Sequence, residues 1–467
     1  MAIGSRFVGT IDQMAAHNVF ALPPHVPDSG ITLGNQLFSG AVFEIDPAGY
    51  QNAGYIEGKS IVILGARDVG KTTLAKLIAY YLSADRIGEA DRMRISIDDT
   101  RRNFGVPEYA GLARALGSEE VDLSKHRINF LDPKMGSSFS DQLGTVIQIL
   151  EHVGGEPLVR YEPLGLQVAL SLLMDKYSQI ATPEVLVHLL NRVNASDLAT
   201  YQATFSARLE SQLSSEAQLL LRLGDSESDT EKALSPTNVN EADFLQDAGR
   251  VYAKLMRLLN GDYSNIFGGD HTLSEVLNQR VVALDYTGID ISAFVLVQSL
   301  VWRWRTSALR RGDTRYLSNL EIHDENYGMW EHPIYATNMY SHLKKIRATG
   351  EIVVRVQHRL DDSYAVGSAG SEVREKAVNS LNETDMWFIG RQPQSAIPRL
   401  KERLGLDDWV CKHITQLGKG EFYFKMGQQP PVPFKLYLDP IIRRAMTETN
   451  MANDYMLGLT DRVSVPS

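Results

Sequence analysis

The sequence has almost no cysteine, since Cys411 is the single one among 467 residues. One cysteine cannot close an intramolecular disulfide, and it cannot supply the cysteine clusters of structural zinc sites. A disulfide-stabilised scaffold and a cysteine zinc site are therefore excluded. Such low cysteine usage is typical of a protein from a reducing compartment.

Long hydrophobic runs are missing as well. No segment approaches the roughly 20 apolar residues that a membrane-spanning helix requires. The start, "MAIGSRFVGTIDQMAAHNVF", has no basic end followed by an apolar region, so we expect no signal peptide. We therefore expect a cytoplasmic protein without a membrane span, which would reach the inner face of the membrane only through partners.

Positive charge is in the minority, with 47 Lys and Arg against 57 Asp and Glu and a net charge of −10. This balance argues against non-specific binding of nucleic acid by the surface as a whole, although a local basic groove stays compatible with it. Hydrophobic residues make up 43% of the chain, which is enough for a large core. At roughly 150 residues per domain, the length predicts two to three domains.

The most informative stretch is "GARDVGKT", from Gly65 to Thr72. It follows the apolar run "SIVIL" and precedes the helical pattern "TLAKLIAYYL", which is the context of a phosphate-binding loop. The loop N–H groups and the positive end of the helix would bind phosphate. Lys71 would contact the β- and γ-phosphates, and the Thr72 hydroxyl would bind Mg²⁺. The predicted nucleotide-binding residues are Gly65, Ala66, Arg67, Asp68, Val69, Gly70, Lys71, Thr72 and Thr73.

The tip of this loop is unusual, because Arg67 and Asp68 stand where small residues are commoner. Solvent exposure is the only explanation that the sequence offers for them. A chance match in a turn is the alternative interpretation of the whole stretch. The agreement of strand, loop and helix argues against it.

Acidic residues end two of the predicted strands. Asp324 and Glu325 close "LSNLEIH", and this pair suits the chemistry: Asp324 for the Mg²⁺ shell and Glu325 to polarise the attacking water. The alternative is a surface acidic pair at a turn, because Glu321 and His323 are polar in a strand that should be apolar on both faces. Asp285, which closes "VVALD", is either a second metal candidate or a cap at the end of its strand.

The order of the predicted elements indicates the fold. Short apolar strands alternate with helices before and after an amphipathic helical block, which predicts a parallel sheet with an all-helical insertion. The path from Lys71 to Asp324 is longer than nucleoside kinases and small GTPases usually need. The predicted divisions are a β-rich entry segment (1–58), a first core part (59–160), the all-helical insertion (161–265), a second core part (266–440) and a tail (441–467).

Several stretches together resemble one family, the conjugation-type ATPases of type IV secretion within the HerA/FtsK superfamily. Over roughly residues 25–440 the chain is most similar to the motor modules of actinobacterial conjugative elements. The Walker B box of that family is similar to "HDENYGMW", and its loop apex is usually built of small residues. The other similar stretches are "GITLGNQLFSGAVFEIDP", "HRINFLDP", "VVALDYTGID", "VQHRLDD" and "VGSAGSEVREKAVNSLNETDMWFIGRQP".

The resemblance implies a RecA-like P-loop ATPase core that binds ATP and Mg²⁺ at the subunit interfaces of a ring, most simply a homo-hexamer. Gln357 matches a glutamine that senses the γ-phosphate, and an ordinary strand-end glutamine is the alternative. Arg347 matches an arginine that enters the site of a neighbouring subunit, and a solvated basic cluster is the alternative. Arg391 is a second candidate for that role. The implied catalytic residues are Lys71, Gln357, Arg347 and Glu325.

The implied function is an ATP-hydrolysing motor that powers conjugative or type IV secretion-type transfer of DNA or protein. Its expected partners are membrane components of such a system, and DNA is a further candidate partner. A DNA-translocating HerA/FtsK-like pump or coupling protein is the alternative function, and a paralogue that binds nucleotide without hydrolysis is a third. Trp302 and Trp304 alternate with arginines, but helical spacing favours a core position over stacking on nucleic acid. His358 and Arg359 are interpreted as structural residues, because no second metal ligand lies at helical or hairpin spacing from His358.

Overall fold

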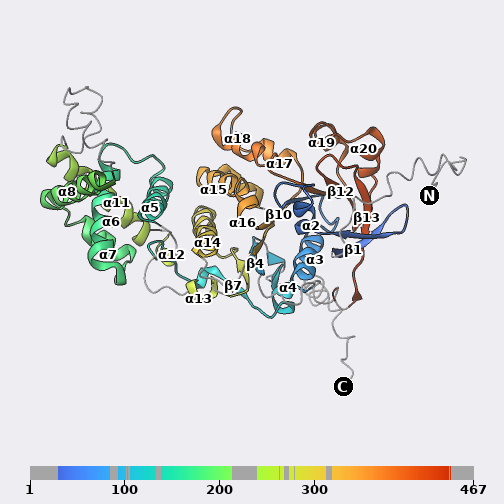
Figure 1. Cartoon of the computed structure of the whole chain (residues 1–467), viewed down its shortest axis with the longest axis horizontal. Helices are drawn as coiled ribbons and strands as arrows, with labels where there is room; N and C mark the ends of the chain where they lie inside the picture. The colour runs from blue at the N-terminus through green and yellow to red at the C-terminus, as the bar shows by residue number, and fades with distance from the viewer. Residues whose placement is uncertain are drawn as a thin grey trace, which may run out of the picture. The chain divides into compact units, whose positions relative to one another are not determined.

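The computed structural model describes residues 30–84, 93–100, 102–103, 106–132, 138–212, 239–261, 263–267, 273–277, 279–311, 318–324, 326–440 and 442. The chain divides into two compact units (Figure 1), which are described one at a time. We call the first the sheet unit, made of Met1–Lys125, Glu275–Val295 and Leu309–Ser467 within these limits. The second is the helical unit, made of His126–Ser274 and Leu296–Ala308.

The sheet unit contains an 11-stranded sheet, counted over the described residues. Its parallel part runs in the order β11-β3-β10-β9-β4-β8-β7. These strands are β3 (Ser60–Leu64), β4 (Met93–Asp99), β7 (Glu120–Asp122), β8 (Val281–Asp285), β9 (Ser318–Asp324), β10 (Ile352–Gln357) and β11 (Met386–Ile389). The predicted α/β fold with a mainly parallel sheet is therefore confirmed.

Antiparallel strands extend the sheet beyond β11, in the order β12-β13-β1-β2. Their bounds are β12 (Glu421–Met426), β13 (Val432–Leu436), β1 (Ile31–Gln36) and β2 (Val42–Ile45). Two short strands, β5 (Arg102–Asn103) and β6 (Val106–Pro107), form a separate pair. The hairpin of β1 and β2 and the helix α2 (Pro47–Asn52) lie in residues 30–58, the described part of the predicted entry segment.

The helices of the sheet unit are mostly short. They are α2 (Pro47–Asn52), α3 (Lys71–Ala84), α4 (Ala110–Ala115), α15 (Pro333–Leu343), α16 (Ile346–Thr349), α17 (Asp361–Ala365), α18 (Glu372–Asn379), α19 (Ile397–Leu404) and α20 (Asp408–Ile414), with 3₁₀ turns at Leu123–Lys125, Asn326–Glu331 and Gln394–Ala396. Two further helices contain residues of both units, α13 (Leu273–Leu277) and α14 (Ile291–Arg311).

Helix α3 packs on one face of the parallel strands. Its buried residues, among them Leu74 and Ile78, share a core with Ile61 and Ile63 of β3 and with Val354 of β10. Alternate residues of β3, Val62 and Leu64, belong to a second core on the other face. A parallel strand buried on both faces explains why "SIVIL" is continuously apolar.

Strand β9 carries polar residues inside the protein. Glu321 and His323 are 0% and 1% exposed, so the strand is central although it is not apolar. His323 Nδ1 lies 3.0 Å from an Asp98 oxygen, and its Nε2 lies 3.3 Å from Glu321 Oε2. The same glutamate oxygen lies 3.3 Å from His342 Nε2 on α15. Ion pairing across the sheet therefore allows polar residues at these positions.

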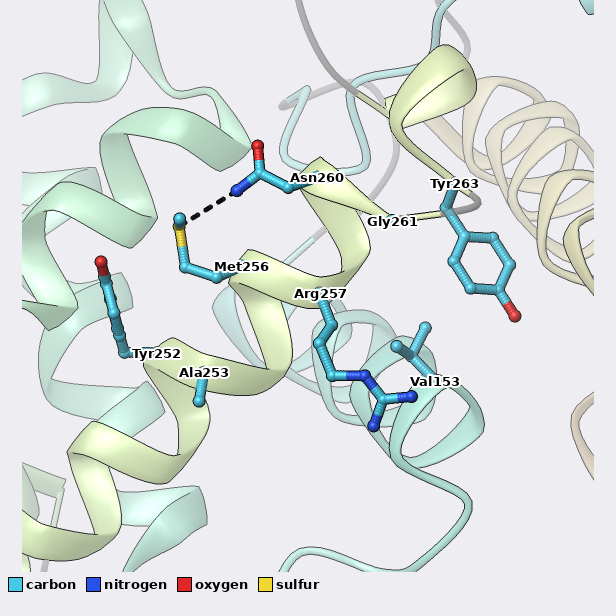
Figure 2. Close-up of a pocket in the computed structure, with 8 residues that line it drawn as sticks. All are labelled: Val153, Tyr252, Ala253, Met256, Arg257, Asn260, Gly261 and Tyr263. Atoms are coloured by element: carbon cyan, nitrogen blue, oxygen red, sulfur yellow. Dashed lines mark hydrogen bonds between the residues drawn. The ribbon is translucent and has the colours of Figure 1, made fainter.

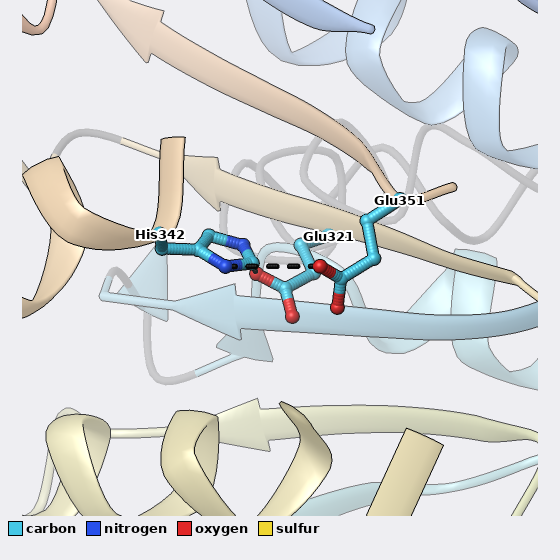
Figure 3. A group of neighbouring side chains, drawn as sticks. All are labelled: Glu321, His342 and Glu351. Atoms are coloured by element: carbon cyan, nitrogen blue, oxygen red, sulfur yellow. Dashed lines mark ion pairs between the residues drawn. The ribbon is translucent and has the colours of Figure 1, made fainter. Parts of the chain in front are cut away.

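The cluster ends at Glu351, whose Oε2 lies 3.7 Å from Nδ1 of His342 (Figure 3). Glu321, His342 and Glu351 bring one possible ligand atom each within 4.8 Å of one another. The Nε2 of the imidazole, however, already lies beside Glu321 and its Nδ1 beside Glu351, so both ring nitrogens face a carboxylate. We interpret the group as a chain of ion pairs and not as a metal site.

The ion pairs make stability depend on pH. Burial alone lowers the pKa of His323, but its hydrogen bonds to Asp98 and Glu321 outweigh burial and raise it to about 9. The stabilisation is then complete below the ordinary pKa of 6.5 and is lost as the pH rises through about 9. We expect the free energy of unfolding to fall by on the order of 2 kcal/mol over that window.

Urea unfolding between pH 6 and pH 9.5, without nucleotide or Mg²⁺, measures this effect. His323→Gln should be less stable than wild type at pH 6, and its free energy of unfolding should fall much less as the pH rises. His188→Gln, at an exposed histidine, is the matched control and should show the same fall as wild type. An equal decline in wild type and His323→Gln would contradict the ion-pair interpretation.

The helical unit is built from α5 (Phe139–Gly154), α6 (Glu162–Tyr177), α7 (Pro183–Leu190), α8 (Ala195–Gln212), α11 (Glu241–Asn260) and α12 (Ser264–Phe267), with a 3₁₀ turn at Ser178–Ile180. Thr182 caps α7 by accepting from the Val185 N–H, and Pro183 opens the helix. The unit begins at His126, so it is longer than the predicted insertion of 161–265. Trp304 is 1% exposed, which matches the core interpretation, and Trp302 is half-buried.

A pocket of about 570 Å³ lies along α11 in the helical unit (Figure 2). None of its lining residues belongs to the predicted nucleotide site. They are Val153, Tyr252, Ala253, Met256, Arg257, Asn260, Gly261 and Tyr263. Among the helices that the structure describes in either unit, none combines the length and apolar character needed to cross a membrane.

Candidate nucleotide-binding site

The loop "GARDVGKT" connects β3 to α3, which begins at Lys71. Neighbouring strands fix its backbone at three points. The Ala66 N–H donates to the Arg391 carbonyl (2.9 Å), the Gly65 N–H donates to the Gln357 carbonyl (3.3 Å), and the Val69 carbonyl accepts from the Gly420 N–H (2.9 Å). The loop is therefore held in shape by the ends of β10 and β11 and by the turn before β12.

Glycine is required at both ends of the turn. A Cβ on Gly65 would lie 2.5 Å from Val69 Cγ2, which is too close for any side chain to be added. Gly70 has φ of +100°, a conformation that residues with a Cβ rarely adopt. Val69 itself is buried, so its side chain closes the inside of the loop.

The unusual tip also has a physical explanation. Asp68 is exposed and adopts φ of +61°, the left-handed region. Aspartate and asparagine tolerate this region better than other residues that carry a Cβ. Arg67 is exposed and does not have positive φ. Aspartate is therefore favoured at position 68 because it tolerates a positive φ. The backbone at Arg67 imposes no such requirement.

Asp68→Val is accordingly expected to destabilise the loop. A β-branched residue in the left-handed region should cost about 1–2 kcal/mol and weaken nucleotide binding, whereas Asp68→Gly should keep wild-type binding. Urea unfolding and titration with an ATP analogue measure the two quantities. Asp68→Asn is the matched control, because it removes the charge and keeps a residue that tolerates the left-handed region. An equal loss in Asp68→Val and Asp68→Asn would contradict the backbone explanation.

Lys71 is buried at the start of α3, with 6% of its surface exposed. Its Nζ donates to the Ala66 carbonyl (3.0 Å) and lies 3.1 Å from Nδ1 of His358. His358 directly follows β10, and its carbonyl accepts from Gln392 Nε2 (2.9 Å). The contact with Lys71 could not be predicted from the sequence, because no local pattern links two residues that are 287 positions apart.

Asp324 at the end of β9 meets Thr72 from α3. The Thr72 hydroxyl donates to Asp324 Oδ2 at 2.9 Å, and the Tyr109 hydroxyl donates to the same oxygen at 2.7 Å. The other carboxylate oxygen, Oδ1, is buried and has no hydrogen-bond partner among the described residues. The predicted metal residues Thr72 and Asp324 therefore lie together in space, although they are 252 positions apart in the sequence.

The donor set fits Mg²⁺, which prefers oxygen ligands and usually keeps several waters. Thr72 offers a hydroxyl oxygen, and Asp324 offers Oδ1, a carboxylate oxygen without a hydrogen-bond partner among the described residues. Asp285 is occupied differently, because its Oδ1 accepts from the N–H (2.9 Å) and hydroxyl (2.5 Å) of Thr287. This arrangement is the cap at the end of β8 that formed the alternative interpretation.

Gln357 ends β10, between the strand of the loop and the strand of Asp324. It is fully buried, and both polar atoms of its amide lack a hydrogen-bond partner among the described residues. An unsatisfied buried amide is costly unless a ligand completes its bonds. The position suits a group that contacts bound nucleotide or its attacking water.

The other predicted catalytic residues lie elsewhere. Glu325 lies outside the described residues. Arg347 is in α16, before β10 begins, so it lies at the edge of the sheet opposite Gln357 and pairs with exposed Glu57 at 3.2 Å. Arg391 is exposed at the end of β11, and its carbonyl holds the loop. The structure thus does not bring Arg347 to the site of its own subunit.

Solved structures share this fold. VirB4 of Thermoanaerobacter pseudethanolicus is similar over 90% of this chain and 100% of its own, with a TM-score of 0.60 at 16% identity. The bacterial conjugative coupling protein TrwB in its unbound form matches with a TM-score of 0.48 at 14% identity, over 88% of this chain and 90% of its own. TrwB in complex with the GTP analogue GDPNP matches with a TM-score of 0.45 at 13% identity, over 88% of this chain and 96% of its own. No protein-family model and no curated protein sequence matches the chain. The resemblance predicted from the sequence is confirmed at the level of the fold, which is that of VirB4.

Proposed function

We propose that this chain is a Mg²⁺-dependent ATPase, the motor of conjugative or type IV secretion-type transfer of DNA or protein. The observation that carries the ATPase is that Lys71 and Thr72, at the start of α3, lie beside Asp324 and Gln357, at the ends of β9 and β10. The fold of VirB4 supports the link to secretion.

Each residue has a role that its contacts support. Lys71 would leave the Ala66 carbonyl and His358 to bind the β- and γ-phosphates, helped by the N–H groups of the loop. Thr72 and Asp324 would hold Mg²⁺, which neutralises phosphate charge when bound. Gln357 would orient the attacking water or report the γ-phosphate through its amide. Glu325 is proposed as the residue that polarises that water.

The proposal includes a ring, because Arg347 lies away from the site of its own subunit. A guanidinium supplied by the next subunit would stabilise the charge that develops on the transferred phosphoryl group. A homo-hexamer with nucleotide at its interfaces fits this role. We propose that it acts in the cytoplasm, docked on membrane components of a transfer system.

ATP hydrolysis by the purified chain with and without DNA tests the function. A secretion motor should hydrolyse ATP at the same rate in both conditions. Stimulation by DNA that falls steeply with salt would instead support the DNA-translocating pump or coupling protein. Nucleotide binding without hydrolysis in either condition would contradict the motor and support a non-hydrolysing paralogue.

A further inference from the structure

Tyr109 lies beside the proposed metal site but belongs to none of the sequence patterns that define it. It precedes α4 and is completely buried. Its hydroxyl donates to Asp324 Oδ2 at 2.7 Å, a shorter hydrogen bond than the 2.9 Å one from Thr72 to the same oxygen. Both donors to Asp324 thus bind one oxygen, and Oδ1 is left open among the described residues.

Three contacts hold Tyr109 in place. Its N–H donates to Asp99 Oδ2 at 2.9 Å, from the end of β4. The Lys76 ammonium lies 5.2 Å from the centre of the phenol ring, and it donates to the carbonyl of the preceding residue, Glu108, at 2.5 Å. Lys76 lies in α3, the helix that also carries Thr72, so Tyr109 is fixed to the phosphate-binding element as well as to the sheet.

The two hydroxyls that donate to Asp324 Oδ2 come from different elements, Tyr109 from the segment before α4 and Thr72 from α3. An oxygen that accepts two fixed hydrogen bonds cannot rotate away, so the second oxygen of the carboxylate keeps one direction.

We infer that Tyr109 is a positioning residue for the magnesium site, fixing the Asp324 carboxylate so that Oδ1 faces the ion or its waters. This inference rests on the proposed function, because it needs Mg²⁺ to bind beside Thr72. It assigns a role in metal binding to the segment between β4 and β7. Tyr109 would act on the ion only through Asp324.

Tyr109→Phe tests the inference, since it removes the hydroxyl and keeps the ring. Affinity for a non-hydrolysable ATP analogue is titrated with Mg²⁺ and with EDTA, and hydrolysis is measured against Mg²⁺ concentration. We expect affinity in EDTA to be unchanged, the gain from Mg²⁺ to be reduced about tenfold, and half-saturation to shift to about tenfold higher Mg²⁺. Tyr50→Phe, at another fully buried tyrosine of the sheet unit, is the matched control.

The outcomes are distinguishable. Wild-type Mg²⁺ dependence in Tyr109→Phe would overturn the inference while leaving the proposed function intact. Equal losses in EDTA and in Mg²⁺ would show a merely structural role and would overturn it too. A wild-type protein whose nucleotide binding and hydrolysis ignore Mg²⁺ would refute the proposed function, and the inference would fall with it.

Discussion

Lys71→Ala is expected to lower the rate of ATP hydrolysis by about a hundredfold or more, because it removes the buried cation that is proposed to bind the phosphates. In the structure the lysine contacts the Ala66 carbonyl and His358 beside the loop. Phosphate release at saturating Mg²⁺ and ATP measures the effect.

The matched control for this prediction is Lys412→Ala, at an exposed lysine of α20. It should hydrolyse ATP at the wild-type rate. Urea unfolding of both variants verifies that the loop substitution leaves the fold intact. Hydrolysis by Lys71→Ala within twofold of wild type would show that the loop is not the catalytic site.

Arg347→Ala is expected to reduce hydrolysis by about a thousandfold in assembled rings, the lower end of the effect of an arginine supplied by a neighbour. Its partner within the subunit is Glu57, and both side chains are exposed, so the stability of the fold should not change. Arg114→Ala, at an exposed arginine of α4, is the matched control and should leave the rate unchanged.

Mixed rings separate action within a subunit from action between subunits. Arg347→Ala and Asp324→Ala are each expected to be inactive alone. Rings assembled from both should recover activity, because some interfaces combine the intact arginine of one subunit with the intact aspartate of the next. Mixed rings that stay inactive, although wild-type subunits restore activity in the same protocol, would contradict the arrangement in trans.

Much of the fold follows from local patterns. The strand "SIVIL", the glycine loop and the helix after it form as predicted. A tight turn requires glycine and a buried parallel strand requires apolar residues, and both signals lie within a few residues of the sequence. Asp324 could be predicted as a partner of Thr72 because the carboxyl ends of parallel strands meet at one edge of a sheet. The carboxyl ends lie at that edge whatever the exact order of the strands.

Other features depend on contacts that no local pattern records. His358 approaches Lys71 from a neighbouring strand, and Tyr109 approaches Asp324 from a segment far away in the sequence. The polar Glu321 and His323 supported the alternative of a surface acidic pair at Asp324 and Glu325, yet ion pairs with His342 and Asp98 allow them to be buried. The positive φ of Asp68 could not be predicted, because an aspartate in a sequence gives no sign of its backbone angle.

The proposed magnesium-dependent ATPase is tested most directly by the requirement of hydrolysis for Mg²⁺ in wild type and in Asp324→Asn. The purified chain is assayed for phosphate release with ATP, in Mg²⁺ and in EDTA. We expect wild type to hydrolyse ATP in Mg²⁺ and not in EDTA, and Asp324→Asn to lose about a hundredfold or more of the rate in Mg²⁺. Hydrolysis that persists in EDTA, or that Asp324→Asn leaves at the wild-type rate, would contradict the proposed function.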